Sequence, residues 1–173
     1  MPELRVIEHQ DTWTSQYALI AAELQSAMPA HGILLEHIGS TAVPGLCAKP
    51  VLDIALGVRM LDEVAASLPE LARLGFTYRP EYEQQIPDRR YFTRAEGPMP
   101  RVHLHALILG GALWTQHLRL RDALREDQML AQAYAALKQR LAVPHAHGKA
   151  AYTEAKAPFI RLVLAGRPRS AHP

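Results

Sequence analysis

The residue types best suited to chemistry gather in a turn of small residues between two apolar runs. Gly39, Ser40 and Thr41 occupy the turn, and Asp53 lies in the second run. Small residues let a backbone approach a ligand closely, and the N–H groups of such a turn are good partners for phosphate. A carboxylate nearby could hold a cation against that phosphate. The segment from 36 to 54 therefore predicts a site that handles a nucleotide or another phosphorylated molecule.

The second apolar run, residues 51–58, predicts a strand with two unlike faces. Side chains alternate along a strand, which puts the bulky residues on one face: Leu52, Ile54, Leu56 and Val58. Asp53 shares the other face with small residues such as Ala55, so this pattern predicts room for a ligand above Asp53. The alternative is a structural role, in which Asp53 caps a turn or pairs with Lys49.

A later strand, residues 102–109, carries His103 and His105 on a single face. Two neutral imidazoles can bind a divalent transition metal, and protonated imidazoles can donate hydrogen bonds to phosphate. With Asp53 they form the candidate catalytic and metal-binding set, for Mg²⁺, Mn²⁺ or Zn²⁺. The alternative is that the two histidines line a half-exposed face without a ligand. A polar pair in an otherwise buried strand favours a site, because buried polar groups need partners.

Several basic residues are candidates for binding the anionic part of a substrate. Lys49 lies close to the turn and could neutralise phosphate, and Arg90 is the second of two arginines that precede a short strand. Arg121 faces the apolar side of its predicted helix, where an arginine must find an anion. That anion could be Asp122 or Asp53, or it could be the substrate.

Hydrophobic periodicity predicts a mixed sheet with helices packed against it, an α+β fold. Asp11, Ser67 and Asp127 are the expected helix caps, with Ser67 in a capping box. Residues 61–74 read as two short helices, or as one helix broken at Pro69. The other predicted helices are 13–28, 114–124, 129–141 and 152–165, and the predicted strands are 33–38, 51–58, 76–78, 91–93 and 102–109. Residues 143–148 read as a loop.

Composition limits the classes of protein that this chain can be. Its 173 residues fit one domain, residues 1–166, followed by a polar tail, residues 167–173. A net charge of +2 is too small to indicate nucleic-acid binding. No apolar run approaches the roughly 18 residues of a membrane-spanning helix, and no signal-peptide pattern is present. The single Cys47 excludes an internal disulfide and fits a reducing compartment, so a cytoplasmic location is expected.

Taken in order, these motifs resemble the GrpB family over nearly the whole chain. The resemblance begins at residues 37–46, 48–50 and 53–54 and continues at 103–105. Toward the C-terminus it includes residues 120–125, 134, 137–138, 141, 152, 155–156 and 159–160. Helix-face lysines are ordinarily solvated, but Lys138 and Lys156 fall in these matching stretches, so they join the substrate-binding candidates.

The resemblance implies a minimal nucleotidyltransferase of the polymerase-beta type, and a link to CoA biosynthesis through family members fused to dephospho-CoA kinase. Nucleotidyltransferases carry two carboxylates at alternate positions of one strand and a third on a later strand. Here Asp53 matches one, Ala55 stands at the second position, and His103 and His105 stand near the third. Since two-metal catalysis needs several anionic ligands, three hypotheses follow: a nucleotidyl-transferring enzyme, a module that only binds a nucleotide or CoA precursor, and, less favoured, a metal-dependent phosphohydrolase.

Overall fold

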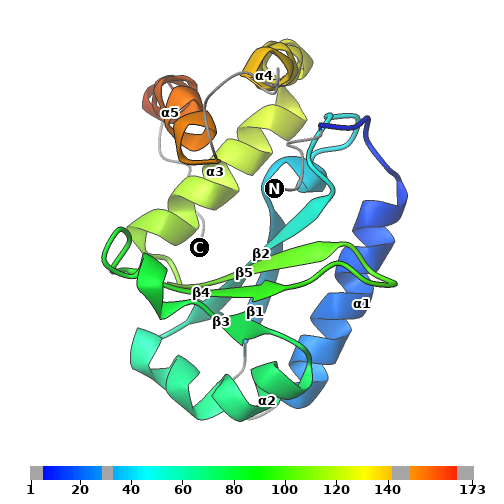
Figure 1. Ribbon diagram of the computed structural model, residues 1–173. Helices are drawn as coiled ribbons and strands as arrows, with labels where there is room; N and C mark the ends of the chain where they lie inside the picture. The colour runs from blue at the N-terminus through cyan, green and yellow to red at the C-terminus, as the bar shows by residue number, and fades with distance from the viewer. Residues whose placement is uncertain (1–5, 29–32, 142–148, 167–173) are drawn as a thin grey trace.

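A five-stranded mixed sheet forms the middle layer of the molecule, a computed structural model that describes residues 6–28, 33–141 and 149–166 (Figure 1). The strand order is β1-β2-β5-β4-β3, with β2 and β5 parallel and the other neighbours antiparallel. The strands are β1 Leu34–Ile38, β2 Val51–Val58, β3 Thr77–Tyr78, β4 Arg89–Arg94 and β5 Arg101–Ile108. This mixed sheet with flanking helices confirms the predicted α+β class.

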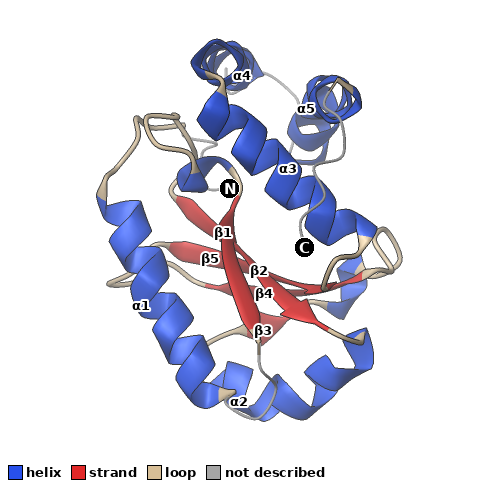
Figure 2. Ribbon diagram, turned by 180° about the vertical axis from the view of Figure 1, so that it is seen from behind, coloured by secondary structure: helices blue, strands red, loops and turns tan. Residues whose placement is uncertain are grey.

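Helices cover the sheet from two sides (Figure 2). The α-helices are α1 Thr12–Ala27, α2 Leu68–Arg73, α3 Ala112–Glu126, α4 Gln128–Leu141 and α5 Lys149–Ala165. Short 3-10 segments are η2 Ser40–Ala42, η3 Leu61–Ser67 and η4 Pro80–Tyr82. Helices α1 and α2 lie on one side of the sheet, and α3, α4 and α5 lie together on the other. Within the described residues, none of the helices combines the length and apolarity needed to cross a membrane.

The bulky faces of β2 and β5 form the main core with α1 and α2. Leu52, Ile54 and Leu104 are fully buried there, against Ile20 and Leu71 of the two helices. Each such side chain stabilises the fold by about 1.5–3 kcal/mol relative to an exposed one. The alternation seen in the sequence therefore leaves the opposite face of β2 and β5, with its polar residues, turned toward α3, α4 and α5.

The hydrogen bonds at the N-termini of three helices can be compared with the caps predicted from the sequence. Asp127 caps α4 as predicted, because its Oδ1 accepts a hydrogen bond from the Leu130 N–H at 3.0 Å. The caps predicted at Asp11 and Ser67 are wrong, since neither side chain bonds to the backbone of its helix. Both residues already have helical backbone angles, and at Ser67 the preceding η3 runs directly into α2. A cap side chain needs the extended backbone that these residues lack.

The extent of one strand also differs from the sequence prediction, and two predicted segments are not compared. Strand β4 is longer than the predicted 91–93, because it pairs with β5 from Arg89 to Arg94. This longer pairing brings Arg89 into the sheet. The predicted loop at 143–148 and the predicted tail at 167–173 lie outside the described residues.

Candidate functional site

Asp53 is the centre of a cluster that three strands and the helical layer build together. In the parallel pairing of β2 and β5, Asp53 lies opposite His103, and Ala55 opposite His105. Asp53 Oδ1 is 3.4 Å from His103 Nδ1 and 3.2 Å from His105 Nε2. The Asp53 side chain is 32% exposed, so a ligand can reach it. The structure thus brings together the three residues that the two strand patterns singled out.

The charge state of Asp53 follows from these neighbours. Burial alone raises the pKa of its carboxyl group, but hydrogen bonds from His103 and His105, reinforced by their positive charge whenever they are protonated, outweigh that effect. The pKa of Asp53 therefore lies well below its usual range. The cluster contains a permanent carboxylate at neutral pH.

His105 is held as one tautomer by partners on both sides. Arg89 NH1 lies 3.4 Å from its Nδ1, and a guanidinium can only donate. His105 Nδ1 is therefore the acceptor, and Nε2 carries the proton that it donates to Asp53. Burial lowers the pKa of His105, which agrees with a neutral ring. Both ring nitrogens of His105 are thus engaged.

The predicted metal set does not have the arrangement of a metal centre. No group of three or more His, Cys, Asp or Glu side chains in the described ranges is placed to hold a metal ion. The physical reason is that the imidazoles of His103 and His105 both contact the same oxygen atom, Asp53 Oδ1. A metal-binding His105 would also need a free lone pair, which Arg89 occupies. No chemical step through a metal is derived from these residues.

The turn before β2 packs directly on Asp53. Gly39 has φ +71°, and a Cβ there would lie 2.6 Å from Asp53 Oδ2, so only glycine fits this close approach. Ser40 forms a side-chain hydrogen bond with Tyr134 of α4. Thr41 is 2% exposed; its hydroxyl donates to the Val51 carbonyl at 3.2 Å and lies 3.0 Å from His37 Nε2. Thr41 therefore fastens the turn to β1 and β2, and its hydroxyl does not face the Asp53 cluster.

The small residues that follow Asp53 make room for a helix as well as for a ligand. Ala55 is fully buried in an apolar cluster with Ile38, Leu107 and Trp114. A Cβ on Gly57 would lie 3.0 Å from the Trp114 ring of α3. Beyond Asp53, the small-residue face of β2 is thus filled by α3, and the Asp53 end of the strand lies beside the turn.

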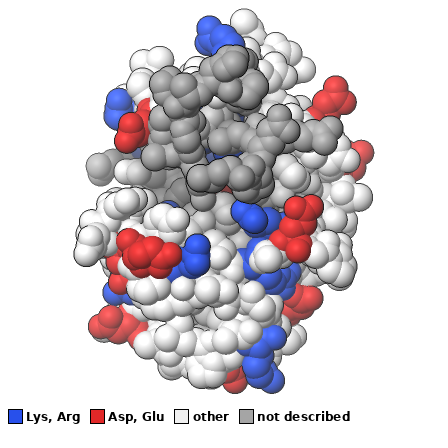
Figure 3. All heavy atoms as spheres, viewed as in Figure 1, with Lys and Arg blue, Asp and Glu red and all other residues white. Residues whose placement is uncertain are grey.

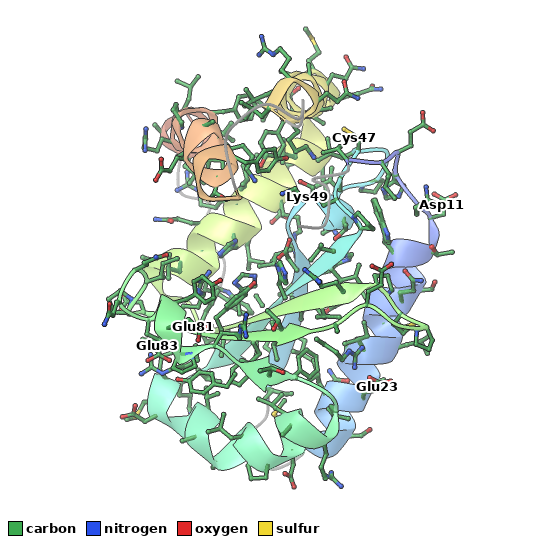
Figure 4. All side chains as sticks on the ribbon, in the orientation of Figure 1. Asp11, Glu23, Cys47, Lys49, Glu81 and Glu83 are labelled. Atoms are coloured by element: carbon green, nitrogen blue, oxygen red, sulfur yellow. The ribbon has the colours of Figure 1, made fainter. Side chains whose placement is uncertain are left out.

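Two predicted lysines meet at one tyrosine ring. The ammonium nitrogens of Lys49 and Lys156 lie 4.0 Å and 4.3 Å from the ring centre of Tyr152. Burial lowers the pKa of Lys156, and the charge of Asp53 opposes that shift. Figure 4 shows Lys49 between the sheet and the helices α4 and α5. Lys49 and Lys156 therefore share the Tyr152 ring, and the charge of Asp53 acts on Lys156.

Lys138 has a different place from the other two lysines. It is 2% exposed, and its Nζ donates to the Cys47 carbonyl. Burial lowers its pKa to about 8. These contacts tie α4 to the connection before β2, so Lys138 positions the helix over the turn.

Two predicted arginines are held away from Asp53 by acidic partners. Arg121 lies 2.5 Å from Glu36 and 2.8 Å from Asp122, and it donates to the His37 carbonyl. This is the ion pair with Asp122 that the sequence left open. Arg90 lies opposite Ala106 on the other face of the sheet, where Glu83 is 3.5 Å away.

Aromatic and basic residues that sequence reasoning did not select complete the cluster. Arg89 and Tyr91 of β4 share the face of His105, and the Arg89 guanidinium lies 4.7 Å from the Tyr91 ring centre. His117 of α3 lies near His105, with ring centres 5.7 Å apart and ring planes tilted by 43°, and burial lowers the pKa of His117 to about 4. The signal was available in part, because extending the predicted strand by two residues puts Arg89 and Tyr91 on the same side. On the face seen in Figure 3, basic and acidic side chains lie beside one another around the part that is not drawn in grey.

Comparison with known proteins agrees with this architecture. The model of the GrpB protein family matches residues 3–165. A UPF0157 protein of Halalkalibacterium halodurans is 30% identical over 93% of this chain and 80% of its own length. The glutamate-rich protein GrpB of Alkalihalophilus pseudofirmus is 26% identical, covering 94% of each chain.

Solved structures give the same family and one weaker likeness. The crystal structure of the conserved protein GrpB from Enterococcus faecalis superposes with a TM-score of 0.79 and 32% identity, covering 92% of this chain and 94% of that one. Cid1 poly(U) polymerase matches with a TM-score of 0.45 and 14% identity, over 77% of this chain and 45% of its own. The family match spans almost every element described above, and the chain belongs to the GrpB family.

Proposed function

We propose that this chain binds a nucleotide or another phosphorylated small molecule beside Asp53, at the site formed by Gly39, Ser40, Lys49 and Lys156. The observation that carries this proposal is the meeting of two lysines at the Tyr152 ring. Like charges in a partly buried place repel each other, and an anion relieves that repulsion. Phosphate suits two ammonium groups beside a serine hydroxyl.

The charge balance of the site supports an anionic ligand. Asp53 is the only carboxylate among the groups that shift the pKa of Lys156. That carboxylate already receives the contacts of His103 and His105. A phosphoryl group would add negative charge beside the ammonium group of Lys156.

The residues favour binding over nucleotidyl transfer. Ala55 stands where the resemblance would put a second carboxylate, and it is packed in an apolar cluster under Trp114. Two-metal transfer needs ligands that hold both ions against the attacking and leaving oxygens. One carboxylate whose oxygen is shared by two imidazoles does not supply them. Binding without turnover is therefore the first function to test.

The test is a thermal-shift and calorimetric screen with nucleoside mono-, di- and triphosphates and phosphorylated CoA precursors, each with and without Mg²⁺, Mn²⁺ and Zn²⁺. A ligand at about 100 times its dissociation constant stabilises the fold by about 2.7 kcal/mol. We expect Lys156→Met to weaken the binding of any hit. Arg161→Met is the matched control, because Arg161 is exposed on the same helix.

Two results would contradict the proposal. No stabilisation by any phosphorylated compound, in a wild-type protein that melts cooperatively, would remove the binding function. Rapid transfer of label from α-labelled nucleoside triphosphates to small acceptors would replace binding with the enzyme hypothesis.

A further inference from the structure

The guanidinium group of Arg89 lacks an acidic partner within the described part of the chain. Its NH1 approaches only the neutral His105 Nδ1, at 3.4 Å, and its plane lies over the Tyr91 ring. Its Nε is buried without a hydrogen-bond acceptor. No ion pair among the residues that the structure describes includes Arg89, whereas the other two arginines of β4, Arg90 and Arg94, each have a carboxylate partner. A charged donor in this state costs free energy until an anion binds it.

The groups that face Arg89 explain why it stays without a counter-ion. Burial lowers the pKa of Arg89, while Tyr91, Asp53 and Tyr82 oppose that shift. Of these, only Asp53 is charged at neutral pH, and its Oδ1 is engaged by His103 and His105. Arg89 is half-buried, so part of its side chain is accessible to solvent.

Arg89 and the lysines lie at different ends of the Asp53 cluster. Lys49 precedes the start of β2, whereas Arg89 pairs with Leu107, near the end of β5. Asp53 and the imidazole of His105 lie between them. A single phosphoryl group therefore cannot contact both cationic ends, because the Asp53 carboxylate and the His105 ring separate them.

We propose that Arg89 is a second anion subsite, which binds a further anionic group of the ligand whose first phosphoryl group lies at Lys49 and Lys156. This inference rests on the proposed function and narrows it. The ligand class becomes a small molecule with at least two anionic groups held apart, as in a polyphosphate or a bisphosphate. Arginine is suited to binding this second anionic group because two N–H donors of its guanidinium group can bind two oxygens of one phosphoryl group.

The experiment measures binding of orthophosphate, pyrophosphate and inorganic triphosphate by calorimetry. In wild-type protein we expect affinity to rise with the length of the probe. Arg89→Met should weaken triphosphate binding by about tenfold to a hundredfold, the value of one charge-assisted contact. Orthophosphate binding should stay within about twofold, because a single group fits at the lysines.

Arg90→Met is the matched control, since it removes the same charge from the adjacent residue on the opposite face of the sheet. It should leave triphosphate binding unchanged. Arg89→Lys is the second variant, which keeps the positive charge but lacks the paired N–H donors of the guanidinium group. If Arg89→Met does not fold, the result with Arg89→Lys decides. Selective weakening of triphosphate binding in Arg89→Lys supports the subsite, and triphosphate binding as tight as that of the wild type overturns it.

The failures of the two proposals are distinguishable. If Lys156→Met weakens all the probes while Arg89→Met binds triphosphate like the wild type, the Arg89 subsite is refuted and the binding function stands. If the wild-type protein takes up none of the three probes, the subsite is refuted, and the screen with nucleotides and CoA precursors decides the proposed function separately.

Discussion

Replacing Gly39 with alanine tests whether the turn is built around the Asp53 carboxylate. Gly39 has φ 71° and ψ −171°, a backbone region that is nearly exclusive to glycine and costs other residues about 1–3 kcal/mol. The new Cβ would also lie 2.6 Å from Asp53 Oδ2, so the carboxylate must move. Moving it weakens the 3.2 Å contact with His105, and a charge-assisted hydrogen bond contributes about 1.5–3 kcal/mol. We expect Gly39→Ala to lower the free energy of unfolding by roughly 3–5 kcal/mol.

The chain supplies a matched control in Gly45. It has φ +74°, but a Cβ there meets nothing within 4 Å, so Gly45→Ala carries only the backbone cost of about 1–2 kcal/mol. Urea unfolding of both variants measures the difference, and the double variant with Asp53→Ala should recover part of the Gly39→Ala loss. Equal destabilisation by Gly39→Ala and Gly45→Ala would refute the contact between the turn and Asp53.

Three further predictions concern the same cluster. Asp53→Asn should remove one source of pH dependence. Because folding lowers the pKa of Asp53 from 3.8, this carboxylate stabilises the folded state above that pH and loses the effect as the pH falls. In acid unfolding below about pH 4, the stability of the wild type should therefore fall more steeply than that of the variant. Burial lowers the pKa of His117 to about 4, so wild-type stability should decline as the pH falls from 6.5 to 4, by up to about 1.4 kcal/mol per pH unit. An equally steep decline in His117→Gln would contradict the assignment of this effect to His117. Ala55→Asp should lower stability by about 3–5 kcal/mol in urea, because the new carboxylate would be buried against Trp114 while His105, opposite it, is already engaged by Asp53 and Arg89; an unaltered midpoint would show that the apolar cluster tolerates charge.

Alternation along the strands was enough to predict the centre of the site. Asp53 and the pair His103 and His105 each interrupt an apolar pattern of period two, which fixes the face on which they lie. The sequence could not say that β2 and β5 are adjacent and parallel. That pairing puts Asp53 opposite His103 and makes one cluster from two separate motifs.

Local rules predicted the elements better than their ends. The strand at 51–58 and the cap at Asp127 are confirmed, because hydrophobic period and a short side-chain bond are properties of neighbouring residues. Ser67 shows the limit of such rules. Its capping-box pattern is present, but η3 already holds its backbone in a helical conformation, and tertiary packing of η3 decides that.

The partners of the arginines were decided only by the tertiary structure. Sequence composition requires that buried guanidinium groups find anions, but it does not say which of several carboxylates will be near. Glu36 of β1 reaches Arg121 of α3 across 85 residues, and Glu83 holds Arg90 on the far face. Arg89, one residue away, points toward His105 instead.

By itself, the sequence determined the family, the α+β class and the residues that could do chemistry, because these depend on residue type and on spacing within one element. The tertiary structure decided what surrounds Asp53. It filled the small-residue face with Trp114, engaged both nitrogens of His105, and brought Lys49 and Lys156 to one ring from segments far apart in the chain. Long-range contacts of this kind depend on how whole elements pack, and no local pattern of residues encodes them.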